Sequence, residues 1–268
     1  MKIQVLVDNY TYIDQYYVGE PGVSYYIEMD GKRILFDTGY SNIYLQNAEA
    51  MGIDLSNLTH IVLSHGHNDH SRGLKYLGNY MNLSHLELIA HPDCFLPKQN
   101  GEIDISAPYT MEEISAKMKY IPRRKPYELS KNCIFLGEIP RENNFEPKYS
   151  MGKQKTDQGW EADYIMDDSA LVLRTKEGLF IVTGCSHSGI CNIVNYAMEI
   201  CKEKRIIGIL GGFHLLELNE RVEKTIQYLQ QVSVGQLYPC HCVSLGVKAK
   251  MMEQLNVTEV GVGLVIER

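Results

Sequence analysis

The sequence predicts an α/β fold, an αββα sandwich in which two mixed β-sheets lie face to face with helices outside. Three observations predict it. Apolar runs typical of strands alternate with amphipathic runs typical of helices along most of the chain. The two halves share one order, a hairpin followed by alternating strands and helices. Finally, the 268 residues, of which 44% are hydrophobic, are enough to build a substantial core.

The first half of the chain begins with a strand over residues 1–8. A hairpin follows, whose strands Val23–Asp30 and Lys32–Phe36 meet across Asp30-Gly31. The next elements are a helix, a strand, a helix and a strand, over Asn42–Met51, Leu58–Leu63, Asp69–Leu77 and Leu86–Ala90. The strand Leu58–Leu63 leads directly into a histidine-rich run.

The pattern weakens between residues 97 and 166, where we expect an insertion within a single domain that spans residues 1–268. We predict a short helix over Met111–Met118 and a strand over Cys133–Leu136. The stretch Pro140–Tyr164 is polar and lacks periodicity. So long an irregular segment inside a compact domain is typical of a lid or a binding loop.

The second half regains regular periodicity with a hairpin, in which Leu171–Thr175 and Leu179–Thr183 meet across Glu177-Gly178. Helices are predicted over Gly189–Lys202, Glu220–Gln231 and Val247–Leu255. Strands are predicted over Ile206–Leu210, Gln236–Tyr238 and Thr258–Val265.

Charge and cysteine content exclude several classes of partner. The formal net charge is -7, and the basic run Arg123-Arg124-Lys125 is too short to grip a phosphate backbone, so no nucleic-acid partner is expected. No stretch approaches the roughly 18 apolar residues of a membrane span. The chain starts without a signal-peptide pattern, and its seven Cys lack a Cys-x-x-Cys pair. We therefore expect reduced thiols and a cytoplasmic location.

The run Ser64–His70 holds four potential metal ligands, His65, His67, Asp69 and His70. Imidazole and carboxylate are ligands for zinc, manganese and iron. Alternate residues of an extended segment share one face, and a following helix turn can bring His70 to the same cavity. One loop can therefore supply two ligands to each of two divalent ions, which would clamp an oxyanion and a bridging hydroxide. We expect zinc, with manganese or iron as alternatives.

Further ligands must return from distant parts of the chain. Three His directly follow predicted strands: His187, His214 and His241. Sites in layered α/β proteins collect at such strand-to-helix turns. For His214, a substrate contact, a metal ligand and a structural role all remain open, and Gly211-Gly212 before it permits a close backbone approach.

The run His65-Gly66-His67-Asn68-Asp69-His70 resembles the His-x-His-x-Asp-His signature of the metallo-β-lactamase-fold superfamily. The resemblance implies that Asp37, in Phe36–Gly39, supports the metal loop through hydrogen bonds. It also implies that His241, after Pro239, is the final metal ligand. Where the superfamily supplies a bridging Asp, this chain has Gly184-Cys185.

The metal ligands that we expect are His65, His67, Asp69, His70, His187 and His241. Asp69 or solvent alone would bridge the ions, while Cys185 is the weaker candidate and would be a buried thiol. Asp168, just before the strand Leu171–Thr175, could approach the site, but an exposed turn carboxylate is the expected role. Asp69 and His214 are the candidate catalytic residues.

Three longer motifs narrow the resemblance to one branch of the superfamily, named for 7,8-dihydropterin-6-methyl-4-(β-D-ribofuranosyl)aminobenzene 5'-phosphate synthase. These motifs are Gly184–Ile190, Gly211–Leu215 and Pro239–Cys242. The resemblance covers nearly the whole chain and indicates the fold and the metal site more strongly than the substrate.

Three functions follow from these motifs. The first is a metal-dependent hydrolase whose dinuclear-site hydroxide attacks a phosphoester-like or other small electrophile. The second is the pterin-related transferase that the branch name implies, which joins a dihydropterin pyrophosphate to an aromatic amine. In it, Arg141 or Arg123-Arg124 would meet a phosphate, and Tyr149, Trp160 and Tyr164 would stack on a flat ring.

The third function is a diiron sensor or redox carrier. It ranks last because Asn68 stands where such proteins carry a Glu, and because the chain is too short for a flavin-binding partner domain. A small-molecule substrate is the expected partner in the first two functions. A homodimer contact through Tyr16-Tyr17, Tyr25-Tyr26 or the insertion also remains open.

Overall fold

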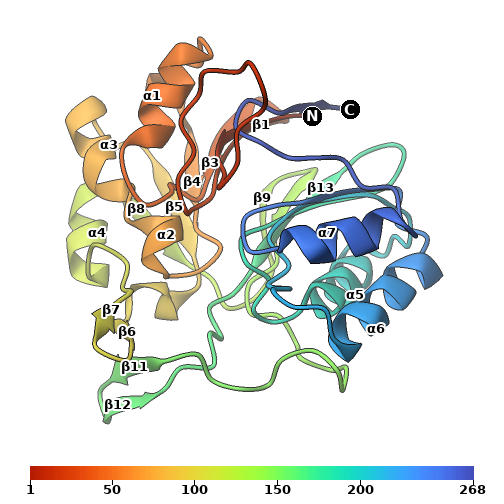
Figure 1. The fold of residues 1–268 in the computed structure, drawn as a ribbon. Helices are drawn as coiled ribbons and strands as arrows, with labels where there is room; N and C mark the ends of the chain where they lie inside the picture. Colours follow the sequence, from red (N-terminus) through yellow and green to blue (C-terminus); the bar gives the residue numbers. More distant parts are fainter.

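Two central β-sheets lie face to face between two layers of helices in the computed structural model, which describes all 268 residues (Figure 1). The expected α/β sandwich is therefore confirmed. The first sheet has the strand order β17-β1-β2-β3-β4-β5-β8. Its strands are β1 (Lys2–Val7), β2 (Ser24–Met29), β3 (Lys32–Phe36), β4 (His60–Val62), β5 (Glu87–Ala90), β8 (Lys119–Pro122) and β17 (Val265–Glu267).

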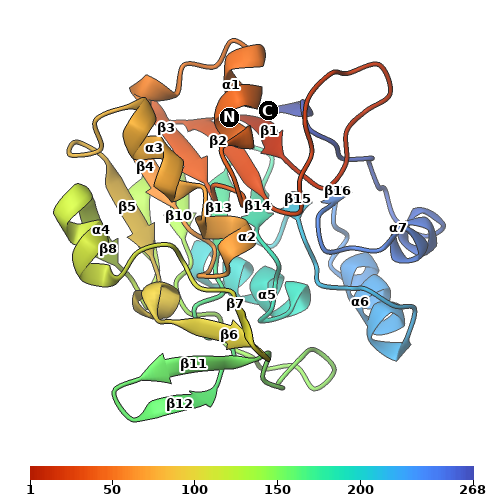
Figure 2. The same cartoon turned by 60° about the vertical axis from the view of Figure 1, so that its left-hand side comes forward.

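The second sheet comes mainly from the C-terminal half and has the order β16-β15-β14-β13-β10-β9. Its strands are β9 (Tyr127–Ser130), β10 (Cys133–Phe135), β13 (Ala170–Arg174), β14 (Leu179–Thr183), β15 (Ile206–Gly211) and β16 (Gln236–Pro239). A third, four-stranded sheet contains β6 (Lys98–Asn100), β7 (Ile103–Asp104), β11 (Lys153–Thr156) and β12 (Gly159–Ala162). Figure 2 shows this third sheet beside the two main sheets.

The helices divide between the outer faces of the two sheets (Figure 1). On the first sheet lie α1 (Ile43–Ala50), α3 (Leu74–Tyr80) and α4 (Met111–Lys117). On the second lie α5 (Ile190–Cys201), α6 (Glu220–Gln231) and α7 (Leu245–Met252). The short α2 (Asn68–Ser71) follows β4, and 3-10 turns occur at Leu55–Asn57 and Pro92–Phe95. No helix has both the length and the apolar character that crossing a membrane requires.

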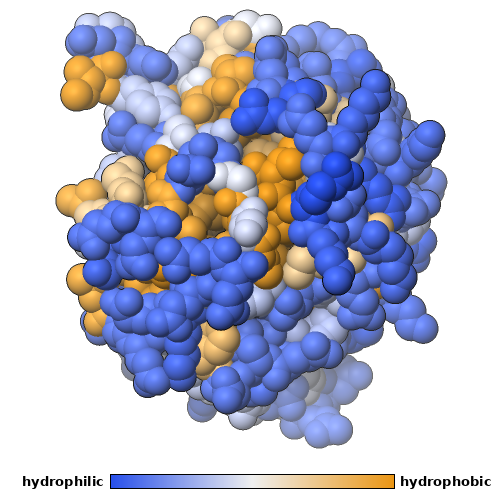
Figure 3. Space-filling model, turned by 90° about the vertical axis from the view of Figure 1, so that its right-hand side faces the viewer, coloured by the Kyte–Doolittle hydropathy of each residue, from blue (hydrophilic) through white to orange (hydrophobic).

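Strand periodicity sorts the side chains into three cores. In β2, Tyr25 and Ile27 point into the cluster between the sheets, whereas Tyr26 packs beneath α1. In β14, Phe180 enters the same central cluster and Ile181 packs beneath α5. Successive strand residues face opposite sides of a sheet, so each main sheet is apolar on both faces. The outer surface over α6 and α7 is mostly hydrophilic, and its hydrophobic side chains gather in a central hollow (Figure 3).

Two predicted elements differ from the structure. The helix expected over Asp69–Leu77 is split, because the Gly73 amide donates to Gly39 instead of continuing the helix. The strand expected over Thr258–Val265 forms only from Val265. The preceding residues cross from the second sheet to the first, with isolated bridges at Val257 and Val262.

The segment 97–166 does not lie as one piece. Its strands β8, β9 and β10 belong to the two main sheets, and only the four-stranded sheet stands outside them. This sheet also includes two strands inside the stretch predicted to be irregular. The Tyr25-Tyr26 contribution to a dimer contact is wrong, because both side chains are buried, whereas Tyr16 is 94% exposed.

Candidate metal centre

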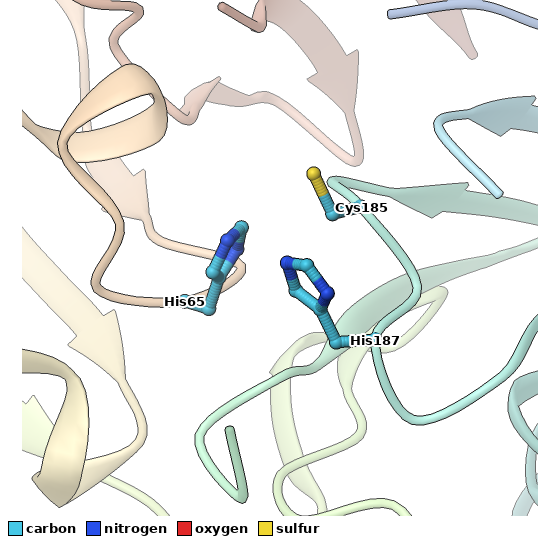
Figure 4. A group of neighbouring side chains, drawn as sticks. All are labelled: His65, Cys185 and His187. Carbon is cyan, nitrogen blue, oxygen red and sulfur yellow. The ribbon is translucent and has the colours of Figure 1, made fainter. Parts of the chain in front are cut away.

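The candidate ligands converge where strands of both main sheets end. The run His65–His70 follows β4 of the first sheet. In the second sheet β14, β15 and β16 pair in parallel, so the residues that follow them meet at one edge. His187, His214 and His241 come from these three strand ends. Figure 4 shows His65 from one half and Cys185 and His187 from the other, pointing toward a common space.

The two halves approach closely because Gly184 has no side chain. A Cβ at this position would lie 2.1 Å from Ser64 Oγ and 3.0 Å from Asp37 Oδ2. The loop after β14 therefore packs against the metal loop in a way that any larger residue would prevent. Gly212 packs in the same way, since its Cβ would lie 2.5 Å from Cys242 Sγ.

One group of donors consists of His65, His67 and His187. His65 Nε2 lies 3.0 Å from His67 Nδ1, and the ring centroids of His65 and His187 are 4.9 Å apart. Both ring nitrogens of His187 and Nε2 of His67 are buried without a hydrogen-bond partner. Buried polar atoms normally have a partner, so these nitrogens are available to bind a cation.

A second group consists of His70, His241 and Asp69. Asp69 Oδ2 lies 3.6 Å from His70 Nε2 and 3.4 Å from His241 Nε2. Cys185 adjoins this group, with its Sγ 3.1 Å from His70 Nε2. His65, Cys185 and His187 place one donor atom each within 4.8 Å of one another, and so do His70, Cys185 and His241. The structure thus brings together all six expected ligands, and adds Cys185.

Asp37 orients the ligands of the first half. Its carboxylate accepts hydrogen bonds from Ser64 N and Ser64 Oγ, each at 2.7 Å, and from His70 Nδ1 at 2.7 Å. Because Ser64 Oγ donates to Asp37, it accepts from His65 Nδ1 at 2.9 Å. A proton of His65 and one of His70 are therefore held on Nδ1, and each ring turns its Nε2 toward the other donors. The supporting role predicted for Asp37 is confirmed.

The sequence analysis does not identify three residues that support the candidate ligands, Asp8, Asn9 and Asp167. His241 donates from its backbone N to Asp8 Oδ1 at 2.9 Å and from Nδ1 to Asn9 Oδ1 at 2.8 Å. Gly66 N donates to Asp167 Oδ2 at 2.8 Å. The only available signal was the position of these polar residues at predicted strand ends, which is common to ordinary turns.

Asp168 corrects a prediction. It is buried rather than exposed, and its Oδ2 accepts from Ser188 N at 2.9 Å. Burial raises its pKa to about 6. Asp168 thus holds the turn that carries His187, beside the centre.

Burial sets the protonation of the imidazoles. Desolvation lowers the pKa of His67 and of His214 to about 4, and lowers those of His65 and His187 well below the ordinary value. Neutral imidazole is the form that binds a metal ion. His70 differs: burial opposes its charged form, but Asp69 and Asp37 raise its pKa to about 9. Burial raises the pKa of the Cys185 thiol.

A cavity of about 640 Å³ opens at these donors. The third sheet and its connections supply Asn100, Ile105 and Met151 to its wall. The side chains from the centre and its loops that line it are His67, Asp69, Cys185, His187, His214, His241 and Cys242. No Lys or Arg lines it. Its volume suits a small molecule.

The cationic and aromatic residues proposed for a phosphate and a flat ring lie elsewhere. Arg124 pairs with Asp93 at 2.7 Å and Glu138 at 3.2 Å, and Arg141 donates to backbone carbonyls. Tyr149, Trp160 and Tyr164 do not line this cavity, so its geometry gives these assignments no support. His91 hydrogen-bonds to Glu138 at 3.2 Å and also lies outside the cavity.

The donor set fits divalent ions. Five imidazoles, one carboxylate and one thiol meet at the cavity, and each is a ligand for zinc or a related ion. The nitrogen and oxygen atoms of these donors lie close to one another, and several of the nitrogens have no hydrogen-bond partner. Such an arrangement is repulsive unless protons or cations lie between the donors.

Comparison with known proteins identifies the family to which this chain is similar. Residues 17–82 match the profile of the Metallo-beta-lactamase superfamily. A protein of Methanocaldococcus jannaschii named 7,8-dihydropterin-6-methyl-4-(beta-D-ribofuranosyl)-aminobenzene-5'-phosphate synthase is 31% identical, over 96% of this chain and 92% of that protein. An uncharacterised protein of the same organism is 32% identical, over 98% of this chain and 99% of that protein.

A solved structure described as a metal-dependent hydrolase of the beta-lactamase superfamily is 31% identical. It superposes with a TM-score of 0.85 and covers 100% of this chain and 99% of its own. The resemblance predicted from the motifs is therefore confirmed. With such relatives along nearly its whole length, the chain belongs to the metallo-β-lactamase superfamily and is an enzyme of the hydrolase or related transferase type.

Proposed function

We propose that this enzyme is a metal-dependent hydrolase with a dinuclear centre, most simply of zinc, with manganese and iron as alternatives. The observation that carries the proposal is the set of buried imidazole nitrogens, on His67 and His187, that have no protein partner and belong to residues lining the cavity. His65, His67 and His187 would hold one ion, and Asp69, His70 and His241 the other.

Divalent ions held here would supply a water nucleophile at neutral pH and Lewis-acid stabilisation of charge on the substrate. The chain's own residues orient the reactants. His214 lines the cavity beside His187, with 4.6 Å between the ring centroids, and it belongs to neither donor group. With its pKa near 4 it is neutral at pH 7, so it orients the substrate by a hydrogen bond and accepts a proton only transiently.

The substrate in this proposal is a small phosphoester or similar electrophile. Because no Lys or Arg lines the cavity, only the ions and the imidazoles would meet an anionic group. Asn100, Ile105 and Met151 would contact the rest of the substrate. The four-stranded sheet would then act as a lid or wall within a single domain, and nucleic acid would not be a substrate.

The test is hydrolysis by protein reloaded with zinc, manganese or iron after chelation. A generic phosphodiester such as bis(p-nitrophenyl) phosphate, an activated ester and a thioester are the probe substrates. We expect turnover of at least one of them that depends on the added metal. His214→Ala should lower turnover roughly 100-fold or more while metal content stays unchanged. Absence of bound metal, or metal-independent turnover, would contradict the proposal.

A second candidate is the pterin-related transferase. It is favoured by the relative named as a synthase, which aligns with 96% of this chain. The uncharacterised relative from the same organism is equally similar, so identity alone does not choose between the functions. The decisive assay supplies a dihydropterin pyrophosphate with and without an aromatic amine. Product formation that requires both substrates, with no turnover of simple esters, would favour the transferase.

A further inference from the structure

We propose that the thiolate of Cys185 bridges the two ions of the centre, in the place where a carboxylate would otherwise do so. This inference rests on the proposed dinuclear centre and specifies the ligand that its two halves share.

Cys185 is the residue shared by the two sets of close donors, His65–Cys185–His187 and His70–Cys185–His241. Its Sγ lies 3.1 Å from His70 Nε2, and within 4.8 Å of donor atoms of His65, His187 and His241. Two donors to one tetrahedral ion lie about 3–4 Å apart, because each metal–ligand bond is about 2.0–2.3 Å. The thiol therefore lies within reach of both ions.

Asp69 is less suited to bridging. Its ion-pair contacts are with His70 and His241, both in the second group, at 3.6 and 3.4 Å. No comparable contact joins it to His65 or His187. Asp69 would thus be a ligand of the second ion alone, which leaves Cys185 as the protein group between the ions.

The turn geometry fixes the thiol in this position. Cys185 is 4% exposed and lies between Gly184, which permits the close approach to Ser64, and Ser186, which has a positive φ of 56°. Ser186 Oγ donates to Gly212 O at 2.6 Å and so ties this turn to the loop after β15. Figure 4 shows Cys185 beside His65 and His187, and its sulfur lies within 4.8 Å of a donor atom of each.

The chemical step is a ligand substitution without electron transfer. The S–H bond of Cys185 would break and its proton would pass to solvent, while the sulfur would replace one water molecule on each of the two ions. No oxidant or further reactant is required.

Cys242 offers a matched control within the same cavity. Its Sγ accepts a hydrogen bond from His214 N at 3.3 Å, and it belongs to neither donor group. A sulfur signal from Cys242 would therefore report a different arrangement from the one proposed here.

The experiment combines metal content, X-ray absorption and cobalt spectroscopy on the intact protein. With two zinc ions bound, a bridging thiolate gives about one sulfur per zinc at about 2.3 Å. With cobalt in place of zinc, it gives a sulfur-to-metal charge-transfer band in the near ultraviolet. Cys185→Ser should abolish both signals and Cys242→Ser should retain both. Cys185→Asp should bind two ions without the sulfur signals.

Four outcomes would overturn the proposal. About one sulfur per two zinc ions would mean a terminal thiolate, and two ions without sulfur would mean no thiolate ligand. Signals lost in Cys242→Ser but kept in Cys185→Ser would assign the sulfur to Cys242. These three results would leave the dinuclear centre intact. Wild-type protein that binds fewer than two ions would overturn the dinuclear centre itself, and the bridge with it.

Discussion

The two halves of the molecule build their shares of the centre in different ways. The first half supplies four donors from one short run that ends in α2. The second supplies His187, His214 and His241 from three separate strand ends, and two of these residues have positive φ angles, 47° at His214 and 51° at His241. Such backbone conformations are costly and persist only where the surrounding structure enforces them.

The halves also exchange support. Asp8 and Asn9 of the first half hold His241 of the second, and Asp167 of the second half holds Gly66 of the first. Lys98 in β6 binds Asp167 at 3.1 Å, so the third sheet is joined to the metal loop. The comparison of the two halves teaches that the run His65–His70 can present its donors locally. The complete centre requires the two sheets to pack together.

The largest effect should follow from removing one ligand of each half. His67→Ala and His241→Ala should each lower activity roughly a thousandfold or more, because each leaves one ion without a full set of ligands. Bound metal should fall from about two ions to about one, while the far-UV circular dichroism stays unchanged. Full activity in both variants would refute the ligand assignment for both halves.

Removing the metal should show how strongly the centre joins the halves. An ion present at about 100 times its Kd stabilises the folded state by about 2.7 kcal/mol. Chelation should therefore lower the Tm by roughly 5–10 °C per ion. The three apolar cores do not involve the centre, so secondary structure should persist at room temperature. The measurement is thermal unfolding with and without chelator, and an unchanged Tm would contradict the expectation.

The close approach at Gly184 can be broken directly. Gly184→Ala would place a methyl group 2.1 Å from Ser64 Oγ, and should destabilise the protein by about 1–3 kcal/mol. Gly246→Ala in α7 is the control, since its Cβ meets nothing within 4 Å and alanine favours a helix by about 1 kcal/mol. Urea unfolding should show opposite signs for the two variants; equal stabilities would disprove this account of Gly184.

The smallest effects are expected from replacing the residues that hydrogen-bond to the candidate ligands, Asp37 for the first half and Asn9 for the second. Asp37→Asn should weaken zinc binding roughly 10- to 100-fold, because the buried carboxylate orients His70 and Ser64. Asn9→Ala should weaken it less, at most about 10-fold, since Asn9 is exposed and makes one side-chain bond to His241. Competition with a chromogenic chelator measures both, and a larger loss in Asn9→Ala would reverse the comparison.

Much of the fold could be predicted because strand periodicity and turn signals act locally. The hairpin at Asp30-Gly31 and the helix Glu220–Gln231 form where the sequence places them. The helix expected over Asp69–Leu77 failed because the Gly73 amide bonds to Gly39, a contact that no local pattern encodes. The strand expected from Thr258 failed for a similar reason, since that segment crosses between the two sheets.

The residues of the site likewise fall into those that local sequence predicts and those that distant contacts determine. The donors in His65–His70 follow from their spacing, because neighbours in sequence are neighbours in space. The burial of Asp168 depends on the turn at Ser188, twenty residues later, and the placement of Cys185 depends on His65 and His70, more than a hundred positions away. The distant arginines were assigned to a phosphate because sequence reports their charge and not their partners, which are Asp93 and Glu138 for Arg124.

By itself, the sequence determined the sandwich architecture, the histidine run and the superfamily, because each depends on residue types at short and regular spacing. Only the tertiary structure decided which strand ends meet, which carboxylates support the centre and which wall the third sheet provides. The physical reason is that parallel pairing of β14, β15 and β16 sets these contacts, and pairing between strands is a long-range choice made by the packed core.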